Sequence, residues 1–585
     1  MIKDRFRLPT LERFRHQVAD VNALPQLAIL GLFSGLFSGM VVILFRHAVE
    51  LPLQHILPNL DDENFEGLTL LERIGLPVFV GILLLIVLYK VKPKYLRVGI
   101  THVIERLGYH QGHLPIKNML VQFFGGSLAI ISGQPVGREG PAVHLGAACS
   151  SLLGQWLKLP NNSIRTLVGC GAAGAISAAF NTPIAGVIFA MEVIMMEYTI
   201  AGFTPVILAA VTAAVLSEMV YGMAPAFSVP PMFLTSLWEL PLVVVVGIMA
   251  GIIAASFTHL VQLTCQLRSR PLWQRIILAS LLTAVSGAFL PEIMGVGYDT
   301  VNMTLSSAVP LQLLCFLVIG KLLVSSTICG LGLPGGLIGP VLFIGASLGG
   351  ALGIAGGFLT DASGSPSGFY AMLGMGAMMG AVLQAPLAAL MAVLELTQNP
   401  HIILPAMLVI VVASMTSKYF FKKPSVFLAQ LQAQGLNFRN DPLSQALQRT
   451  SVSSIMERQF VRLARHCSFE EASQALATKP IWIVIDTDKP EAILLAADLA
   501  RYLDQIQEET DDEHENDNID LLALPGERKD IIPLYIQATL HEALEKLDQT
   551  QVEALYITSV SAPMINRING IVTRKAIERF YQFKH

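Results

Sequence analysis

Two long stretches of the chain carry no acidic or basic side chain. The first covers the 39 residues between Lys321 and Asp361, and the second covers the 33 residues between Asp361 and Glu395. About 20 consecutive apolar residues cross a bilayer as a helix. In hydrocarbon the backbone polar groups must be satisfied internally, which favours helices. The two stretches therefore predict helices inside a membrane.

The charged residues of the 585-residue chain are unevenly spread. Residues 1–450 contain 45 Lys, Arg, Asp and Glu residues, about 10%, with a net charge of +5. Residues 451–585 contain 37, about 27%, with a net charge of −9. A charge-poor body followed by an acidic soluble tail excludes a protein that is a soluble enzyme throughout. It also excludes a nucleic-acid binder, because no basic face accompanies the tail.

Further apolar runs in the body predict more membrane-spanning helices. They lie near Gln26–Phe45, Leu76–Tyr89, Thr166–Met191, Pro205–Val220, Leu240–Leu263, Ile276–Leu290, Leu311–Leu323 and Ile402–Met415. Gly and Pro interrupt two regions, Gly125–Gly154 and Ile328–Gly357. Such interruptions are typical of half-helices that meet at a binding site, and close packing through small residues is the alternative.

Basic residues flank the predicted spans at both ends. Because Lys and Arg concentrate on the cytoplasmic side, the N-terminus and the tail are both expected in the cytoplasm, in a protein of the cell membrane. The residues are Lys3, Arg5, Arg7, Arg13 and Arg15 before the first span, and Lys418, Lys422 and Lys423 after the last. The opening does not resemble a cleavable signal peptide.

No metal or disulfide framework is expected. The six cysteines are scattered without a CxxC pair and are interpreted as packing residues. His102, His110 and His113 could form a metal site, but a solvated loop is the favoured interpretation.

The body matches itself in two separate blocks. The segment Gly137–Ala147 matches Gly336–Ala346, 199 residues later, in the pattern G-x-x-G-P-x-x-x-[LI]-G-A. Two blocks in the same order at nearly one offset indicate a duplication, and membrane transporters often place the substrate site where such halves meet. In the second block two prolines, 203 residues apart, each precede a glutamate by nine residues: Pro183 with Glu192, and Pro386 with Glu395.

The repeated loop favours an anion as the substrate. Its glycines allow close backbone approach and unusual φ angles, and its proline fixes the start of a helix. The unpaired N–H groups and the positive dipole end at that start attract anions without a full positive charge. A site without a fixed cation also binds weakly enough to release the ion. The alternative is that both loops are only tight turns.

Glu139 lies inside the first loop, where the second loop has Ile338. Acidic residues in membrane segments are costly and are functional candidates. A carboxylate can occupy an anion site itself, so that its protonation or displacement would open the path. An ion pair with Arg138 is the alternative role. Glu192 and Glu395 are expected to be structural, bonding backbone or water.

These motifs resemble the CLC family of chloride channels and chloride/proton antiporters over nearly the whole chain. Gly137–Pro141 spells the specific family motif GREGP, and by this resemblance Glu139 is the gating glutamate. The resemblance implies an antiparallel duplication with broken helices, in a homodimer with one pore per subunit. It also implies an anion site with backbone amides of Leu337 and Ile338 in the family's GxFxP loop. The implied anion-binding residues of the two loops are Gly137, Arg138, Gly140, Leu337, Ile338 and Gly339.

Two departures from the family concern the anion site. The family motif GSGIP aligns with Arg97–Thr101, so Val98 replaces the serine whose hydroxyl contacts chloride. The pore tyrosine aligns with Phe427. The resemblance then implies a central site that relies on backbone amides. Each missing hydrogen bond changes the binding free energy by about 0.5–1.5 kcal/mol, and by more beside a charge. The preferred anion stays open.

A third departure concerns protons. The antiporters of the family carry an internal proton-transfer glutamate immediately after the position of Glu192, and here that residue is Val193. Valine cannot relay a proton, so passive or weakly proton-coupled anion movement is favoured. A water chain past Glu192 would restore coupling, which makes a proton-coupled anion antiporter the second hypothesis. Glu139, Glu192 and Val193 are the proton-pathway candidates. A cation-coupled transporter is the third hypothesis, and an enzyme is not expected.

The tail is predicted to contain two α/β units. The first has a helix at Ser468–Ala477, a strand at Ile481–Ile485 and a helix at Asp498–Leu503, and the acidic run Glu508–Asp520 is expected to be a solvated loop. The second has a helix at His541–Leu547, strands at Ala554–Ile557 and Gly570–Thr573, and a final helix.

This layout resembles a pair of CBS domains, which bind adenine nucleotides in some proteins. The nucleotide motif places Thr or Ser three residues before Asp. Here Leu495 precedes Asp498 and Thr573 precedes Ala576, so each copy keeps half of it. Asp498 and Thr573 are the nucleotide-binding candidates, and a dimerisation or regulatory module is the alternative. No other cofactor is expected.

The predicted architecture is an all-α, multi-pass membrane domain built from an inverted internal repeat with broken helices, followed by an α/β CBS-pair domain. The predicted boundaries are an N-terminal cytoplasmic segment at 1–24, the anion-permeation domain at 25–430, a linker at 431–451 and the CBS pair at 452–585. The two repeats are placed at 25–222 and 240–430. The expected partners are the lipid bilayer, a second copy and a small inorganic anion such as chloride.

Overall fold

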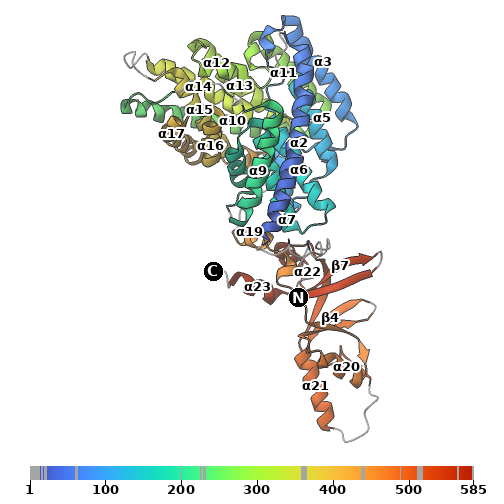
Figure 1. Cartoon of the computed structure of the whole chain (residues 1–585). Coiled ribbons are helices and arrows are strands. Elements are labelled where there is room, and N and C mark those ends of the chain that lie inside the picture. The colour runs from blue at the N-terminus through green and yellow to red at the C-terminus, as the bar shows by residue number, and fades with distance from the viewer. Residues whose placement is uncertain are drawn as a thin grey trace. The chain divides into compact units, whose positions relative to one another are not determined.

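The computed structural model describes residues 14, 18, 23–58, 63–198, 200–223, 227, 229, 232–357, 365–436, 442–487, 489–509, 518–562 and 565–582 (Figure 1). The basic residues predicted to orient the N-terminus lie outside these ranges. The chain divides into two compact units. One comprises Leu27–Leu157 and the residues from Ile164 to 439, and the other comprises the C-terminal residues from 440, Lys158–Ser163 and the residues up to Gln26.

Helices build the first unit. In the described residues their bounds are α2 (Leu24–Ile56), α3 (Leu70–Tyr89), α4 (Gly99–Tyr109), α5 (Ile116–Ile131), α6 (Glu139–Trp156), α7 (Asn161–Phe180), α8 (Pro183–Phe189), α9 (Ile200–Tyr221), α10 (Leu240–Cys265), α11 (Leu272–Phe289), α12 (Tyr298–Leu305), α13 (Leu311–Leu331), α14 (Ile338–Gly357), α15 (Ser367–Leu383), α16 (Pro386–Thr397), α17 (Ile403–Met415) and α18 (Val426–Ala433).

Nine helical segments of the described residues are long and apolar enough to cross a bilayer, and the predicted multi-pass membrane domain is confirmed. Several carry large apolar side chains on their outer surface; Phe79 of α3, for example, is 72% exposed. A soluble protein rarely exposes such extended apolar surfaces, so these faces fit a lipid environment. The segments are Leu24–Ile56, Leu70–Tyr89, Asn161–Phe180, Gly202–Tyr221, Leu237–Ser269, Leu272–Phe289, Leu311–Leu331, Ile338–Gly357 and Pro400–Phe420.

One predicted span is wrong in its continuity. Thr166–Met191 is not a single helix, because α7 ends at Phe180 and α8 begins at Pro183. Asn181 adopts a left-handed φ of +56° between them, and Pro183 can start a helix but disrupts a helix interior. The helix α8 then continues into a π-helical turn at Ala190–Met195. The predicted interruption within Ile328–Gly357 is confirmed, and it falls between α13 and α14.

The duplication is visible in how equivalent helices cross. In the first half α6 and α7 cross at two glycines, and a Cβ on Gly171 would lie 2.2 Å from the carbonyl oxygen of Gly146. In the second half α14 and α15 cross in the same way, and a Cβ on Gly374 would lie 2.1 Å from the carbonyl oxygen of Gly345. Small residues allow such close helix approach in membranes. The pairs stand at equivalent positions of the repeat.

The second unit is an α/β domain with two similar halves. In each half a parallel strand pair is extended by an antiparallel strand, and the two halves join through β4 and β6 in the order β1-β3-β4-β6-β7-β8. The strands are β1 (Phe460–Ala464), β3 (Trp482–Asp486), β4 (Pro490–Leu495), β6 (Arg528–Tyr535), β7 (Ala554–Ala562) and β8 (Ile565–Thr573), with a separate pair β2 (His466–Cys467) and β5 (Ile519–Asp520). The helices are α19 (Pro442–Gln448), α20 (Phe469–Ala477), α21 (Ala496–Glu509), α22 (Leu540–Thr550) and α23 (Arg574–Gln582).

The predicted α/β tail is confirmed, with differences in detail. Strands β1, β4 and β6 were not predicted, because each has only a short apolar run and none shows a sustained alternation of apolar and polar residues. The acidic run Glu508–Asp520 is not entirely a loop, since α21 extends to Glu509 and Ile519–Asp520 forms β5; its middle lies outside the described residues. The segment predicted as a linker contains the end of α18 and all of α19. All six cysteines are free, and Cys315 is exposed.

Alanine at Gly171 or Gly374 is expected to destabilise the membrane unit by about 1–3 kcal/mol, because the added methyl group meets backbone atoms that cannot move aside. Thermal unfolding of each purified variant in detergent measures the loss. Gly75→Ala in α3 is the control, since a Cβ there has no neighbour within 4 Å. Equal melting temperatures for Gly374→Ala and Gly75→Ala would contradict the close crossing.

Candidate functional site

The two repeated loops contact each other directly. The amide of Gly137 donates to the carbonyl oxygen of Gly336 at 2.7 Å, and the amide of Gly336 donates to that of Gly137 at 2.8 Å. This antiparallel bridge leaves no space for a side chain, because a Cβ on Gly140 would lie 2.6 Å from the Cα of Gly336. The glycines of the motif are therefore required by close backbone contact.

A second exchange between the halves supports the bridge. The side-chain amide of Gln122 in α5 donates to the carbonyl oxygen of Pro334 at 3.1 Å. In return the hydroxyl of Ser325 in α13 donates to the carbonyl oxygen of Pro135 at 2.8 Å. Pro135 and Pro334 are equivalent in the repeat, each two residues before the bridging glycine. The start of each loop is thus held by a side chain of the other half.

The bridge brings the starts of α6 and α14 together. Helix α6 begins at Glu139 and α14 begins at Ile338, and each has its motif proline in the first turn. The first amides of a helix have no acceptor within it, and the dipole makes this end positive. Two helix starts therefore face one region, as the sequence predicted.

The Glu139 carboxylate is completely buried at this junction. Its Oε2 accepts a hydrogen bond from the amide of Gly339, in the first turn of α14, at 3.2 Å. Its Oε1 accepts a hydrogen bond from the phenol of Tyr298. The carboxylate is therefore bonded to a backbone amide at the start of α14. Helix starts are positions where anions bind.

Arg138 does not pair with Glu139 in the described residues. Its Nη1 lies 3.1 Å from Oε1 of Glu50 in α2, and that carboxylate also pairs with Arg46. The alternative role for Glu139, a simple ion pair with its neighbour, is therefore not the arrangement observed. The side chain of Arg138 also lies apart from the cavity described next.

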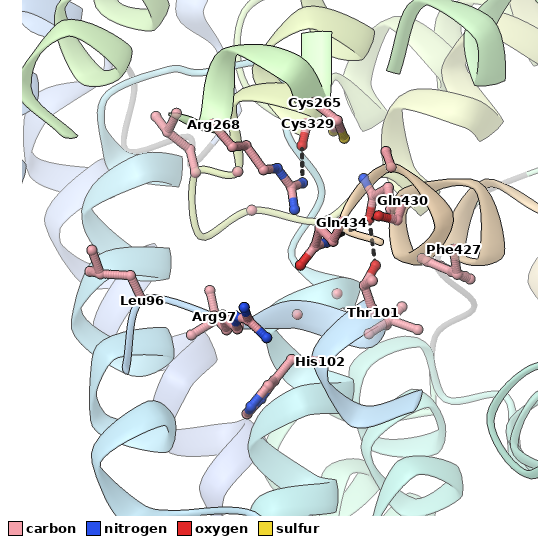
Figure 2. Close-up of a pocket in the computed structure, with 18 of the residues that line it drawn as sticks. Leu96, Arg97, Thr101, His102, Cys265, Arg268, Cys329, Phe427, Gln430 and Gln434 are labelled. Atoms are coloured by element: carbon pink, nitrogen blue, oxygen red, sulfur yellow. Dashed lines mark hydrogen bonds between the residues drawn. The ribbon is translucent and has the colours of Figure 1, made fainter. Parts of the chain in front are cut away.

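A cavity of about 470 Å³ ends at the paired loops (Figure 2). Gly140 and Leu337 of the loops line it, as do Val98 and Phe427. Four predicted anion-site residues from four distant segments thus surround one space. Gly137, Ile338 and Gly339 are buried beside this end of the cavity without lining it.

Neither aligned position supplies a hydroxyl to the cavity. Val98 is the N-cap of α4 and makes no side-chain capping bond, and the following Gly99 has a φ of +81°. Phe427 lies in the first turn of α18, whose N-cap Ser425 accepts from the amide of Leu428. Two more helix starts therefore border the cavity, and the side chains at both of these aligned positions are apolar.

Sequence reasoning missed the polar residues of the cavity wall. Arg268 donates to the carbonyl oxygens of Gly330 and Cys329 at 2.8 and 3.1 Å, and Arg275 donates to that of Leu331 at 2.8 Å. These arginines bind the C-terminal carbonyls of α13, where cations are favourable, and they place positive charge in the wall. Figure 2 also shows Thr101 of α4 bonded to Gln430 of α18, and both residues line the cavity. Arg268 follows α10 and Arg275 lies in the first turn of α11. Neither belongs to a repeated motif, so the sequence pattern did not identify them.

Glu192 and Glu395 each accept hydrogen bonds from a helix start in the opposite half. The Glu192 carboxylate accepts from the amides of Leu387 and Ala388, at 3.4 and 2.7 Å, at the start of α16. The Glu395 carboxylate accepts from the amides of Ile184 and Ala185, at 3.0 and 2.6 Å, at the start of α8. Both bond backbone, as predicted. Neither lines the cavity, and the same holds for the buried Val193.

The predicted solvated loop of histidines is wrong for His102. This residue lies in α4, is 4% exposed, and places its Nδ1 2.9 Å from Nε2 of His144 in α6. The described residues contain no group of three or more His, Cys, Asp or Glu side chains arranged for a metal ion.

The two nucleotide candidates have local partners in the tail. Asp498, in the first turn of α21, lies 3.5 Å from the guanidinium of Arg501. The hydroxyl of Thr573 accepts from the amide of Ala576 at 3.2 Å and caps α23. The structure does not bring the two residues together in one contact.

Comparison with known proteins gives a consistent picture. A model of the voltage gated chloride channel family matches residues 79–418. A ClcB-like chloride channel protein of Ralstonia nicotianae is 30% identical over 57% of this chain and 80% of its own. An H⁺/Cl⁻ exchange transporter, ClcA, of Vibrio cholerae is 28% identical over 64% of this chain and 83% of its own.

Solved structures share the fold. A slow cyanobacterial Cl⁻/H⁺ antiporter has a TM-score of 0.61 at 23% identity, over 70% of this chain and 97% of that one. A eukaryotic CLC transporter has a TM-score of 0.58 at 17% identity, and it covers 94% of this chain and 97% of its own. The second likeness therefore extends through most of the α/β tail.

Replacement of Glu192 or Glu395 by alanine is expected to destabilise the membrane unit by similar amounts, about 1–3 kcal/mol, because each change leaves two helix-start amides without their acceptor. Thermal unfolding in detergent measures both. Glu218→Ala on α9, whose carboxylate has no hydrogen bond among the described residues, is the control. A loss in only one of the two variants would contradict the equivalence of the crossed contacts.

Proposed function

Because the chain belongs to the voltage gated chloride channel (CLC) family, which consists of transporters and channels, we propose that it conducts a small inorganic anion passively or with weak proton coupling, gated by Glu139. The observation that carries this proposal is the Glu139 carboxylate on the amide of Gly339. A negative side chain bonded to a helix start at the end of a cavity is arranged to compete with an anion for the same donor.

The path of the anion follows from the paired loops. An anion enters the cavity past Arg268 and Arg275, whose positive charge attracts it. Both guanidinium groups already donate to backbone carbonyl oxygens, so they do not bind the anion tightly. At the loops it meets backbone amides of Leu337 and Ile338 in place of a fixed cation. It passes when the Glu139 carboxylate is protonated or displaced. Weak, multiple contacts of this kind suit conduction, because the ion must also leave.

The side chains around the site favour weak chloride selectivity. Val98 and Phe427 cannot donate a hydrogen bond, so the ion loses two charge-assisted contacts, each about 1.5–3 kcal/mol when made to a charged group. We expect chloride, fluoride, nitrate and bicarbonate to compete in a flux assay with smaller differences than a hydroxyl-lined site would produce.

Proton-coupled anion exchange is the second candidate. The relatives named as exchange transporters favour it, and Val193, which has no titratable group, opposes it. Glu192, with its carboxylate bonded to the start of α16, is the proton-pathway residue that exchange would require, together with Glu139. The first candidate is preferred because Val193 interrupts that pathway.

The remaining features are also part of the proposal. The protein works in the cell membrane as a homodimer, with its N-terminus and tail in the cytoplasm. Exposed apolar residues such as Ile184 and Leu387, at the starts of α8 and α16, suit a subunit contact.

The tail is a CBS pair with a regulatory or dimerising role. It binds adenine nucleotide weakly or not at all, because Asp498 and Thr573 each complete only half of a motif. Calorimetry of the full protein with ATP, ADP and AMP tests this.

Proteoliposome flux separates the two candidates. We expect an imposed chloride gradient to drive chloride movement with little or no uphill proton uptake. Proton uptake against its gradient at a fixed ratio to chloride would establish exchange instead. In that case Glu192→Ala should reduce proton flux more than Glu395→Ala, since the two residues make matched contacts in opposite halves.

Glu139→Gln is expected to remove the pH dependence of anion flux and to hold it near the wild-type level at low pH, because glutamine cannot ionise and resembles the protonated acid. Chloride flux from proteoliposomes across a pH series measures this. Glu395→Gln, outside the cavity, is the control and should keep the wild-type profile. An unchanged pH response in Glu139→Gln would refute Glu139 as the gate.

A further inference from the structure

Tyr298 is the second donor to the gating carboxylate. Its phenol donates to Oε1 of Glu139, while the amide of Gly339 donates to Oε2. The tyrosine is 5% exposed, so neither partner has ready access to water. A buried carboxylate depends on the donors it reaches, and a bond to an ionised group is stronger than a neutral one. The phenol therefore stabilises the ionised carboxylate in its observed position.

The position of Tyr298 is rigid because its loop is bonded by a buried lysine. The Nζ of Lys321, in α13, donates to the carbonyl oxygens of Ile293, Gly295 and Val296 at 3.0, 2.9 and 3.1 Å. Lys321 is completely buried. One ammonium group thus donates three hydrogen bonds to the residues just before α12. These bonds fix the conformation of the loop.

The start of α12 is also fixed from its other side. The Glu63 carboxylate accepts from the amides of Tyr298 and Asp299 at 2.8 and 3.3 Å. The ring of Tyr298 lies edge to face with Phe227, at a centroid distance of 5.3 Å, and the guanidinium of Arg138 lies 5.3 Å from the ring centre. Packing therefore holds the ring in place, and the hydroxyl donates the hydrogen bond to Glu139.

Tyr298 follows a loop whose equivalent in the first half of the repeat lines the cavity. Val296-Gly297 matches Val98-Gly99 at an offset of 198 residues, and both glycines are left-handed, with φ of +83° and +81°. The loop with Val98 borders the cavity and offers no hydroxyl. Its counterpart in the second half presents Tyr298 to Glu139, so the duplicated loop has a different role in each half.

We propose that Tyr298 is a positioning residue that holds the Glu139 carboxylate on the start of α14 and so sets the pH at which the anion path opens. The proposal rests on Glu139 acting as the gate. When Glu139 is protonated, its affinity for a phenol donor falls and the carboxyl group leaves Gly339. The phenol thus stabilises the closed, ionised state selectively.

Tyr298→Phe removes the hydroxyl and keeps the ring among its aromatic neighbours. We expect chloride flux at neutral pH to rise, and the pH of half-maximal flux to move upward by about one unit, since a hydrogen bond to an ionised group changes such an equilibrium by about tenfold. Proteoliposome flux over a pH series measures both. Incorporation of 3-fluorotyrosine at position 298 makes the phenol a stronger donor and should move the midpoint downward.

Tyr370→Phe is the matched control. Tyr370 is also buried, in α15, and its phenol donates to Oε2 of Glu239 at 2.6 Å, outside the cavity. This variant loses an equivalent hydrogen bond and should keep the wild-type pH midpoint. A midpoint shift of equal size in both variants would overturn the proposal, because it would reflect general loosening.

The Glu139→Gln background separates this proposal from the proposed function. There, Tyr298→Phe should have no further effect on flux or its pH dependence. An equal rise in flux in this background would show that Tyr298 acts on the pore without Glu139, and an unchanged midpoint in the single variant would show that the phenol does not hold the carboxylate. Either result overturns the proposal and leaves Glu139 as the gate. Persistent pH dependence in Glu139→Gln alone would instead overturn the gate itself.

Discussion

The pair of backbone hydrogen bonds between Gly137 and Gly336 determines the geometry of the rest of the site. It joins the two halves at one residue each and directs the starts of α6 and α14 to a common region. Any side chain larger than hydrogen at these glycines would separate the halves. Because the two glycines satisfy one another's backbone groups, the helix starts that follow them lie at one junction, which is the arrangement that the proposed anion site requires.

Each half supplies what the other lacks. Gln122 and Ser325 hold the loop of the opposite half, and Glu192 and Glu395 cap a helix of the opposite half. A half folded by itself would leave these carboxylates, helix starts and loop carbonyls without their partners, which costs free energy in an apolar environment. The duplicated halves are thus expected to fold together.

The repeated features of the site could be predicted because the chain contains them twice. The G-x-x-G-P loops and Glu139 stand out from an apolar background, and their placement at one junction follows from the physics of helix starts. Tyr298 could not be found in this way, because it lies 159 residues from Glu139 and belongs to a loop whose repeat mate has no tyrosine. Arg268 belongs to no repeated motif, so nothing in the sequence singled it out. The break after α7 was not predicted because the left-handed φ of Asn181 cannot be seen in the sequence, although Pro183 marks the start of the next helix.

The loss of equivalence between the halves gives the molecule a direction. Two identical halves would conduct equally from either side. Here Glu139 is matched by Ile338, and the buried Gln122 is matched by the buried Lys321, 199 residues later. Glu139 and Lys321 therefore have no counterpart of the same kind in the other half, and the two sides of the junction differ chemically. If the protein conducts an anion as proposed, this asymmetry predicts unequal currents in the two directions, which is rectification.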